Sequence, residues 1–314
     1  MLKVFLATLD PMLVLFICMI IGFVLNKLRL LPENTATVLS KLENYVLLPA
    51  LTFNTFMKYC TVASLKEKYM LIIYSCAVVI IAIGLSYLLS GFFTKGEYQK
   101  NIYRYALAFG NCGFMGNAIV PAILGEEILY EYLLFTMSLN LAIYTWGLTI
   151  LIPKGETRKN PLKNLLNPTV FAIVLGIICG LLGVEKYVPT FFTTAIGNLS
   201  ACMGPVAMLL AGFVVGNYRI PKLLCNIKVY IATFLRLFIL PAFFIGLLFL
   251  ARADKMTMTL TLFAFATPLG LNTIVFPAAY GGETETGASM AMISHTLCVL
   301  TIPLMYALFT LIFK

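Results

Sequence analysis

Two apolar segments of the chain, residues 108–121 and 264–277, are interrupted at matching positions by the same kinds of residue. Each carries glycine and asparagine within a hydrophobic run and ends in a proline, and the two prolines, Pro121 and Pro277, are 156 residues apart. Glycine and proline interrupt helices, and lipid offers no partner for the backbone groups that an interruption frees. Interrupted segments at corresponding places in two halves are typical of membrane transporters, whose substrate site lies near the bilayer midplane.

Hydrophobic runs long enough to span a bilayer, about 20 residues each, occupy most of the chain. Hydrophobic residues make up 61% of it and charged residues 11%, whereas about 25% of the residues of a soluble protein are charged. We therefore expect one integral membrane domain over residues 1–314 with about ten transmembrane helices. The predicted spans are 4–26, 36–57, 69–92, 102–124, 128–152, 167–184, 188–216, 228–250, 257–280 and 286–312.

The two halves of the chain repeat one another. The most polar connection, residues 153–161, lies near the midpoint and separates five predicted spans from five. An odd number of spans in each copy forces the second copy to enter the membrane in the opposite orientation, so we expect inverted repeats over 1–153 and 162–314. The offset of the breaks also relates other residues of the two halves: Pro49 and Pro205, Gly125 and Gly281.

Positive charge is distributed unevenly between the connections. With the N-terminus outside, thirteen Lys and Arg side chains fall on the cytoplasmic side and eight on the opposite side, among them Lys58, Lys66 and Lys68. This is the positive-inside bias, which predicts a multi-pass protein of the cell membrane, of the bacterial inner-membrane kind, with both termini extracytoplasmic. The net charge of +9 then reflects topology and contact with membrane lipid, and we expect no nucleic-acid partner.

The residues at the two breaks suit an anion. An unwound centre exposes half-helix N-termini whose free N–H groups and partial positive charge attract a carboxylate or phosphate, and an asparagine amide donates a further hydrogen bond. The alternative is that the glycines serve close helix packing, which is common in membranes. The candidate substrate-binding residues are Asn111, Gly113, Gly116, Asn117, Pro268, Gly270 and Asn272, and the candidate helix-breaking residues are Pro121 and Pro277.

Two polar side chains inside predicted spans have two interpretations each. Arg236 either supports a bound anion or else snorkels or pairs with a helix C-terminus, and the second interpretation is favoured. His295, the single histidine, either carries a coupling proton or is neutral and hydrogen-bonded within its helix, and again the second is favoured.

No Asp or Glu is expected deep within a span. Glu43 follows Lys41 at the start of a predicted span, and we expect it at the membrane interface. Carriers driven by Na⁺ or H⁺ usually need an intramembrane carboxylate, so the sequence disfavours tight cation coupling. The other acids near the breaks are expected in surface loops and are assigned no chemistry: Glu126, Glu127, Glu131, Glu283 and Glu285.

Enzyme functions are disfavoured. The chain contains neither GxxxxGK[ST] nor HExxH, and one histidine cannot supply a hydrolytic triad or a zinc site. The eight cysteines lie mostly within predicted spans without CxxC spacing and are expected to pack as small apolar residues. We expect no catalytic residue, no metal and no cofactor.

From about residue 10 to residue 305 the chain resembles the auxin efflux carrier family, which includes plant carriers and bacterial malonate and malate carriers. No single motif is diagnostic, but their order and spacing are specific together. The matching motifs are residues 22–27, 30–33, 45–51, 111–116 and 125–127, Asn140, Gly147, residues 167–168 and 199–200, Pro205, Arg236 with Pro241, and residues 268–272, 280–282 and 301–303.

The resemblance implies an all-α membrane fold, of the bile-acid-symporter or NhaA-like type, with ten helices in two inverted five-helix repeats. Helices 1, 2, 6 and 7 would form a scaffold, through which the protein would form a homodimer. Helices 3–5 and 8–10 would form a transport domain whose fourth and ninth helices are broken and cross. By motif, Asn111 and Asn272 are the polar crossover residues and Pro268 is the second crossover proline.

One departure from the family pattern falls at the first break. Relatives usually carry Gly-x-Pro there, whereas this chain has Gly116, Asn117 and Ala118, and its proline comes three residues later at Pro121. We expect either that the fourth helix closes by one turn at Ala118 or that Asn117 replaces the proline by bonding locally to the backbone.

These features predict a secondary carrier that moves small organic anions, such as mono- or dicarboxylates, by elevator-type alternating access. Asn140, Arg236 and His295 are the expected supporting residues. One alternative is a sodium-coupled organic-anion symporter of the bile-acid type, and another is a membrane sensor that no longer transports.

Overall fold

The computed structural model describes residues 1–153 and 167–313, and the regular elements of this part of the chain are helices. The first half holds α1 (Leu2–Lys27), α2 (Thr35–Leu42), α3 (Leu48–Tyr59), α4 (Val62–Ser90), α5 (Glu97–Ala108), α6 (Asn117–Leu124), α7 (Glu126–Ala142) and α8 (Leu148–Leu151). The second half holds α9 (Pro168–Leu181), α10 (Thr190–Gly216), α11 (Ile220–Leu224), α12 (Ile227–Phe234), α13 (Leu240–Leu250), α14 (Lys255–Phe265), α15 (Asn272–Ala279) and α16 (Glu285–Ile312).

Short π-helical turns connect several of these helices. The turn η1 (Glu43–Leu47) joins α2 to α3, η3 (Ile143–Gly147) joins α7 to α8, and η6 (Leu235–Ile239) joins α12 to α13, while η2 (Cys112–Gly116) leads into α6. A 3₁₀ turn, η5 (Val184–Tyr187), precedes α10. The turns η1 and η6 each lie two residues before a proline, Pro49 or Pro241, which lacks the N–H group that regular helix pairing needs.

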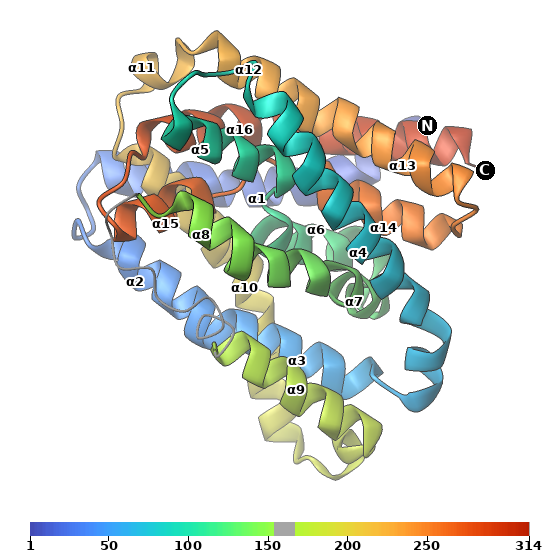
Figure 1. The fold of residues 1–314 in the computed structure, drawn as a ribbon. Helices are drawn as coiled ribbons and strands as arrows, with labels where there is room; N and C mark the ends of the chain where they lie inside the picture. The colour runs from blue at the N-terminus through green and yellow to red at the C-terminus, as the bar shows by residue number, and fades with distance from the viewer. Residues whose placement is uncertain (154–166, 314) are drawn as a thin grey trace.

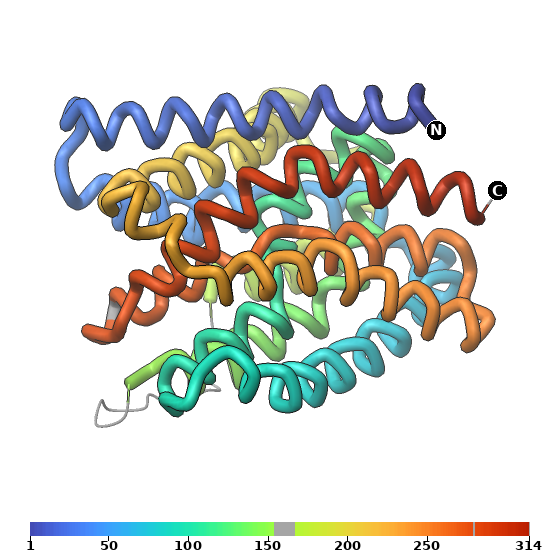
Figure 2. Tube along the Cα trace, turned by 90° about the horizontal axis from the view of Figure 1, so that it is seen from above, coloured from blue at the N-terminus to red at the C-terminus, as the bar shows by residue number. Residues whose placement is uncertain are grey.

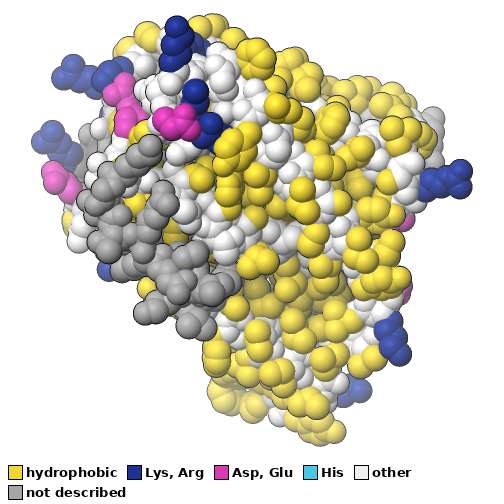
Figure 3. Space-filling model, viewed as in Figure 1, with side chains coloured by type: hydrophobic (Ala, Val, Ile, Leu, Met, Phe, Trp, Pro, Cys, Tyr) yellow, Lys and Arg dark blue, Asp and Glu magenta, His cyan; other side chains and the backbone are white. Residues whose placement is uncertain are grey.

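Six helices within the described residues are long and apolar enough to cross a membrane: Leu2–Lys27, Val62–Ser90, Glu126–Leu151, Thr190–Gly216, Ile227–Leu250 and Glu285–Ile312. The other predicted spans, 36–57, 102–124, 167–184 and 257–280, coincide with helices that are shorter or interrupted. The prediction of an all-helical membrane protein is therefore confirmed. Figure 3 shows the corresponding surface, in which hydrophobic side chains cover the middle and charged side chains gather towards the ends.

Several helices pack in long pairs, of which α1–α10 and α3–α9 run parallel. The helix α1 lies along α10, α3 lies along α9, and α16 runs beside α1, as Figures 1 and 2 show. On the other side of the molecule α4 packs against α5 and α7, and α13 packs against α14. The two termini lie at the same end of the molecule (Figures 1 and 2).

The two interrupted segments cross in the interior. The helix α5 ends at Ala108 and α14 ends at Phe265, and the extended residues that follow pair in an antiparallel bridge between Gly110 and Leu269. The backbone N–H of Asn111 donates to the carbonyl of Pro268 at 2.7 Å. A Cβ atom at residue 110 would collide with neighbouring side chains and backbone, so the crossing requires glycine there.

Arg236, in η6, binds the ends of both interrupted helices. Its side chain is fully buried, and its guanidinium donates to the carbonyls of Leu107 and Ala264 at 3.1 Å each and to those of Ala108 and Thr267 at 3.4 Å each. The carbonyls of Leu107, Ala108 and Ala264 belong to the C-terminal turns of α5 and α14, where helix dipoles place partial negative charge, and that of Thr267 belongs to the segment that follows α14. Arg236 therefore pairs with two helix C-termini at the crossing, in the interior of the protein.

Two acidic side chains are buried against neighbouring helices. Glu43 is fully buried in η1, and Glu131 lies inside α7 at 9% exposure, where it forms an ion pair with Lys68 at 3.1 Å. The placement of Glu131 in a surface loop was wrong. Both residues lie within apolar stretches of the sequence. The sequence alone does not show whether a charged residue in such a stretch faces water or a neighbouring helix.

Replacing Arg236 by Met is expected to destabilise the protein by about 3–5 kcal/mol, because the carbonyls of two buried helix ends lose their shared donor. Arg236→Lys should be intermediate, since an ammonium keeps the charge without the planar fork of donors. Thermal unfolding in detergent measures both effects. Arg219→Met, which removes an exposed arginine, is the matched control, and equal stability of the two Met variants would contradict this role of Arg236.

Candidate functional site

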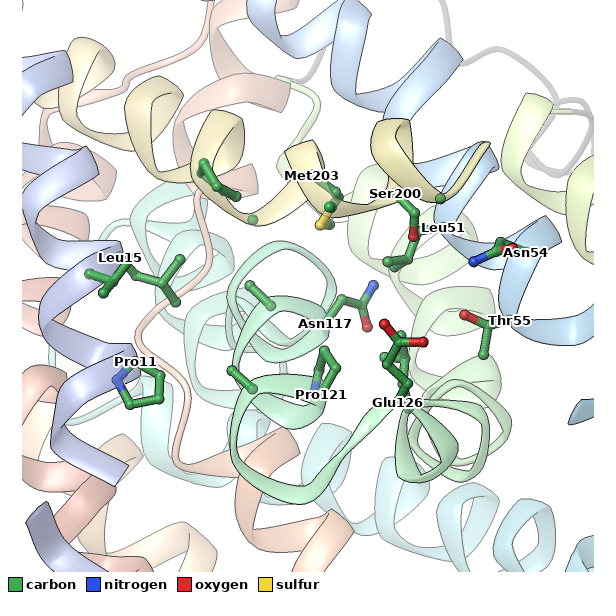
Figure 4. Close-up of a pocket in the computed structure, with 18 of the residues that line it drawn as sticks. Pro11, Leu15, Leu51, Asn54, Thr55, Asn117, Pro121, Glu126, Ser200 and Met203 are labelled. Atoms are coloured by element: carbon green, nitrogen blue, oxygen red, sulfur yellow. The ribbon is translucent and has the colours of Figure 1, made fainter. Parts of the chain in front are cut away.

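A cavity of about 630 Å³, here called the first cavity, lies between α1, α3 and α10 on one side and α6 and the start of α7 on the other. Figure 4 shows the side chains that converge on it. Much of its wall is apolar, with contributions from Leu15, Leu51 and Met203, and its polar lining residues are Asp10, Asn54, Thr55, Lys58, Asn117, Glu126 and Ser200.

Two asparagines form the buried polar part of this wall. Asn117 is the first residue of α6 and is 3% exposed, and Asn54 of α3 is 8% exposed. In both side chains the amide oxygen is shielded and has no hydrogen-bond partner among the described residues, which leaves the NH₂ group as the end that can reach a ligand. In Figure 4 the two side chains project into the cavity from different helices, with Ser200 and Met203 of α10 alongside.

The charged groups of the first cavity are placed nearer to solvent. Lys58 is half-buried, whereas Asp10 and Glu126 are exposed. Charge alone therefore does not select an anion here, and the deeper amides and hydroxyls decide what can bind. Neutral amide and hydroxyl donors suit a carboxylate.

A second cavity of about 300 Å³ is reached from the opposite end of the α2–α3 stretch. Asn272 and Phe276 of α15 line it, together with Phe114, Tyr144 and residues near the junction of α2 and η1, among them Lys41. The amide NH₂ of Asn272 donates to the hydroxyl of Tyr105 at 2.8 Å. The candidate residues Asn117 and Asn272 thus border different cavities, one on each side of the crossing.

Asn111 borders neither cavity. Its side-chain NH₂ lies 3.0 Å from Nε2 of His295, whose Nδ1 lies 2.8 Å from the carbonyl of Ala291. A carbonyl can only accept, so Nδ1 carries the proton and Nε2 accepts from Asn111. His295 is therefore a neutral, fully bonded ring that holds the first break against α16.

The remaining candidates at the breaks have structural surroundings. A Cβ atom at Gly116 would collide with the ring of Tyr132, whose hydroxyl donates to the carbonyl of Cys112 at 3.1 Å, and one at Gly270 would lie 3.4 Å from the carbonyl oxygen of Gly110. A Cβ atom at Gly113 would meet nothing within 4 Å. Close packing therefore accounts for Gly116 and not for Gly113.

The prolines do not mark the breaks themselves. Pro121 and Pro277 lie inside α6 and α15, which continue through them, and the interruptions lie upstream. The first break exists without a proline at Ala118, because it lies between the end of α5 at Ala108 and the start of η2 at Cys112. Ala118 also lies where α6 meets α10, since a Cβ atom at Gly204 would collide with its methyl group.

Sequence reasoning missed Asn54 and placed Asn140 among the supporting residues. Asn54 is a polar residue within the apolar run of its span, and that was the available signal. Asn140 lies in α7 and borders neither cavity. Within the described residues no group of three or more His, Cys, Asp or Glu side chains is placed to hold a metal ion.

Comparison with known proteins agrees with a transporter. The family model described as "Membrane transport protein" matches residues 7–306. An uncharacterized transporter of Methanocaldococcus jannaschii is 26% identical over 306 residues, covering 94% of this chain and 96% of the relative. An uncharacterized transporter of Methanothermobacter thermautotrophicus is 21% identical over 302 residues, covering 96% and 98%. The chain belongs to the membrane transport protein family, that of the auxin efflux carriers.

Proposed function

We propose that the protein is a secondary carrier of small organic anions and that the first cavity is its substrate site. The observation that carries the proposal is the pair of buried amides, Asn54 and Asn117, that face one cavity from two different groups of helices. Asn54 belongs to the α1–α3 and α9–α10 group, and Asn117 belongs to a half-helix that starts at the crossing. A ligand held by both residues would bridge the two groups.

The chemistry of the first cavity supports an anion with an apolar part. The amide NH₂ of Asn117 offers a neutral hydrogen-bond donor to a ligand in this space. The hydroxyls of Thr55 and Ser200 and the ammonium of Lys58 add further donors. Leu15 and Met203 offer an apolar surface for the rest of the molecule.

Alternating access is the proposed mechanism. The chain would form ten spans in two inverted repeats, with α1–α3, α9 and α10 as the scaffold, also the homodimer interface, and with α4–α8 and α11–α16 as the moving domain. Two findings support it: the two cavities flank the crossing, and Gly125 and Gly281, related by the 156-residue offset, both take a positive φ, 100° and 66°, after α6 and α15. Elevator movement of the crossing past α1, α3 and α10 would expose the site to each side in turn.

A panel of mono-, di- and tricarboxylates and aromatic acids should identify the ligand by its effect on thermal stability in detergent. A ligand that binds only the folded protein stabilises it by about 2.7 kcal/mol at a hundredfold excess over Kd. We expect one class of acid to raise the melting temperature, and Asn117→Ala and Asn54→Ala to abolish the shift. Asn140→Ala is the matched control and should keep it. A panel without any selective shift, or a shift that survives both cavity variants, argues against the proposal.

The sign of the ligand charge can be tested with a near-isosteric change. Asn54→Asp places a carboxylate in the first cavity, so saturable exchange of the stabilising acid in proteoliposomes should fall by at least about tenfold, a loss of about 1.4 kcal/mol. Asn140→Asp should leave exchange unchanged. Stronger binding of amines or other cations by Asn54→Asp, with acids unaffected, would show that the carrier moves cations. Replacing Na⁺ by K⁺ in the same assay tests the sodium-coupled alternative.

A further inference from the structure

Glu43 is the one described carboxylate whose two oxygens are both buried and without a hydrogen-bond partner. Its side chain is fully buried in the π-helical turn between α2 and α3. Glu131 differs, because one of its oxygens is paired with Lys68. The role derived for the first cavity does not use Glu43.

Nothing charged compensates Glu43 from the elements around it. The turn η1 packs against α2, α3, α9 and α10, and α9 and α10 contain no Asp, Glu, Lys, Arg, His or Tyr. Lys41 precedes Glu43 by two residues, but it is exposed and borders the second cavity, whereas Glu43 is fully buried. The titratable side chains on these elements and on η1 itself are Lys41, Tyr45, Lys58, Tyr59, Cys179 and Cys202.

A proton is the ligand that this environment accepts. An ionised carboxylate in an apolar interior costs several kcal/mol unless it is paired and hydrogen-bonded, whereas a neutral carboxyl is tolerated far better. A metal ion would need several further oxygen or nitrogen ligands, and the described residues place no such group of acidic, histidine or cysteine side chains here. Proton binding needs no second ligand.

The position of Glu43 connects it to both cavities. Asn44, the next residue, borders the second cavity, so Glu43 is one residue away from that cavity, and the amide of Asn44 donates to the carbonyl of Ser40 at 2.7 Å. The same continuous stretch, from Thr35 to Tyr59, carries Asn54 into the first cavity. The π-helical turn that holds Glu43 is an irregular element of the kind often found at functional sites.

We propose that Glu43 is a proton-binding site that couples the carrier to a proton gradient. The carboxylate takes a proton from water on the side of the second cavity and holds it while it is buried, as in the structure described here. It releases the proton to water when the crossing, whose α15 lines the second cavity beside Asn44, moves past η1 and α10. This proposal rests on the carrier function, since it assigns the coupling ion to that transport cycle.

Infrared spectroscopy tests the site without any substrate. Purified wild-type protein at neutral pH should show the C=O stretching band of a protonated carboxyl, because exposed Asp and Glu are ionised there. The band should shift in D₂O, disappear in Glu43→Gln and persist in Glu131→Gln. If Glu43→Gln does not fold, the test is the pH titration of the C=O stretching band in the wild-type protein, which shows whether a carboxyl is protonated at neutral pH. Absence of the band at neutral pH in wild-type protein overturns the proposal.

Transport tests the coupling in proteoliposomes loaded with the acid that stabilises the protein. Glu43→Gln should keep exchange, which needs no net proton movement, and should lose accumulation driven by an inward-directed proton gradient, down to the level of protein-free liposomes. Glu131→Gln should keep both activities. Gradient-driven accumulation by Glu43→Gln equal to that of the wild type overturns the coupling. If wild-type protein exchanges no acid, the carrier function itself fails and the coupling with it, while the infrared band still reports whether Glu43 holds a proton.

Discussion

The structure depends on one shared cap. The crossing ends two helices in the interior, where their last carbonyls have no access to water, and the Arg236 guanidinium binds carbonyls from both. Unpaired backbone groups are the main obstacle to irregular chain in a membrane. Because the single side chain of Arg236 pairs terminal carbonyls of both α5 and α14, the two breaks form one structural unit. The bridge between Gly110 and Leu269 and the bond from Asn111 to Pro268 then fix their relative position.

Much of this architecture could be predicted from the sequence, because glycine and proline inside apolar runs interrupt helices and few other structures account for them there. The two breaks and the apolar helices follow from such patterns. The roles of single polar residues do not, since they depend on which side of a helix faces which neighbour. Asn111 is bonded to His295, Asn117 lines the first cavity, and Asn54 completes that wall from a distant helix.

The buried carboxylates show most clearly that the surroundings of a single polar residue do not follow from the sequence pattern. Glu43 and Lys41 are two residues apart, and in the sequence this pair of charges resembles the solvent-exposed end of a helix. In the structure Lys41 borders the second cavity, whereas Glu43 is fully buried. The π-helical turn before Pro49 changes the register at that point, so a regular helical projection misplaces the side chains. Local patterns therefore locate the breaks of this protein better than they locate its charges.

The continuous stretch α2–η1–α3 has a thermodynamic consequence. It carries both Glu43 and Asn54, so the two proposed sites are built on one helical stretch. Linkage is reciprocal: if a bound acid changes the affinity of Glu43 for a proton by some factor, the proton changes the affinity for the acid by the same factor. The dependence of substrate affinity on pH would then measure the coupling free energy between the two ends of this stretch.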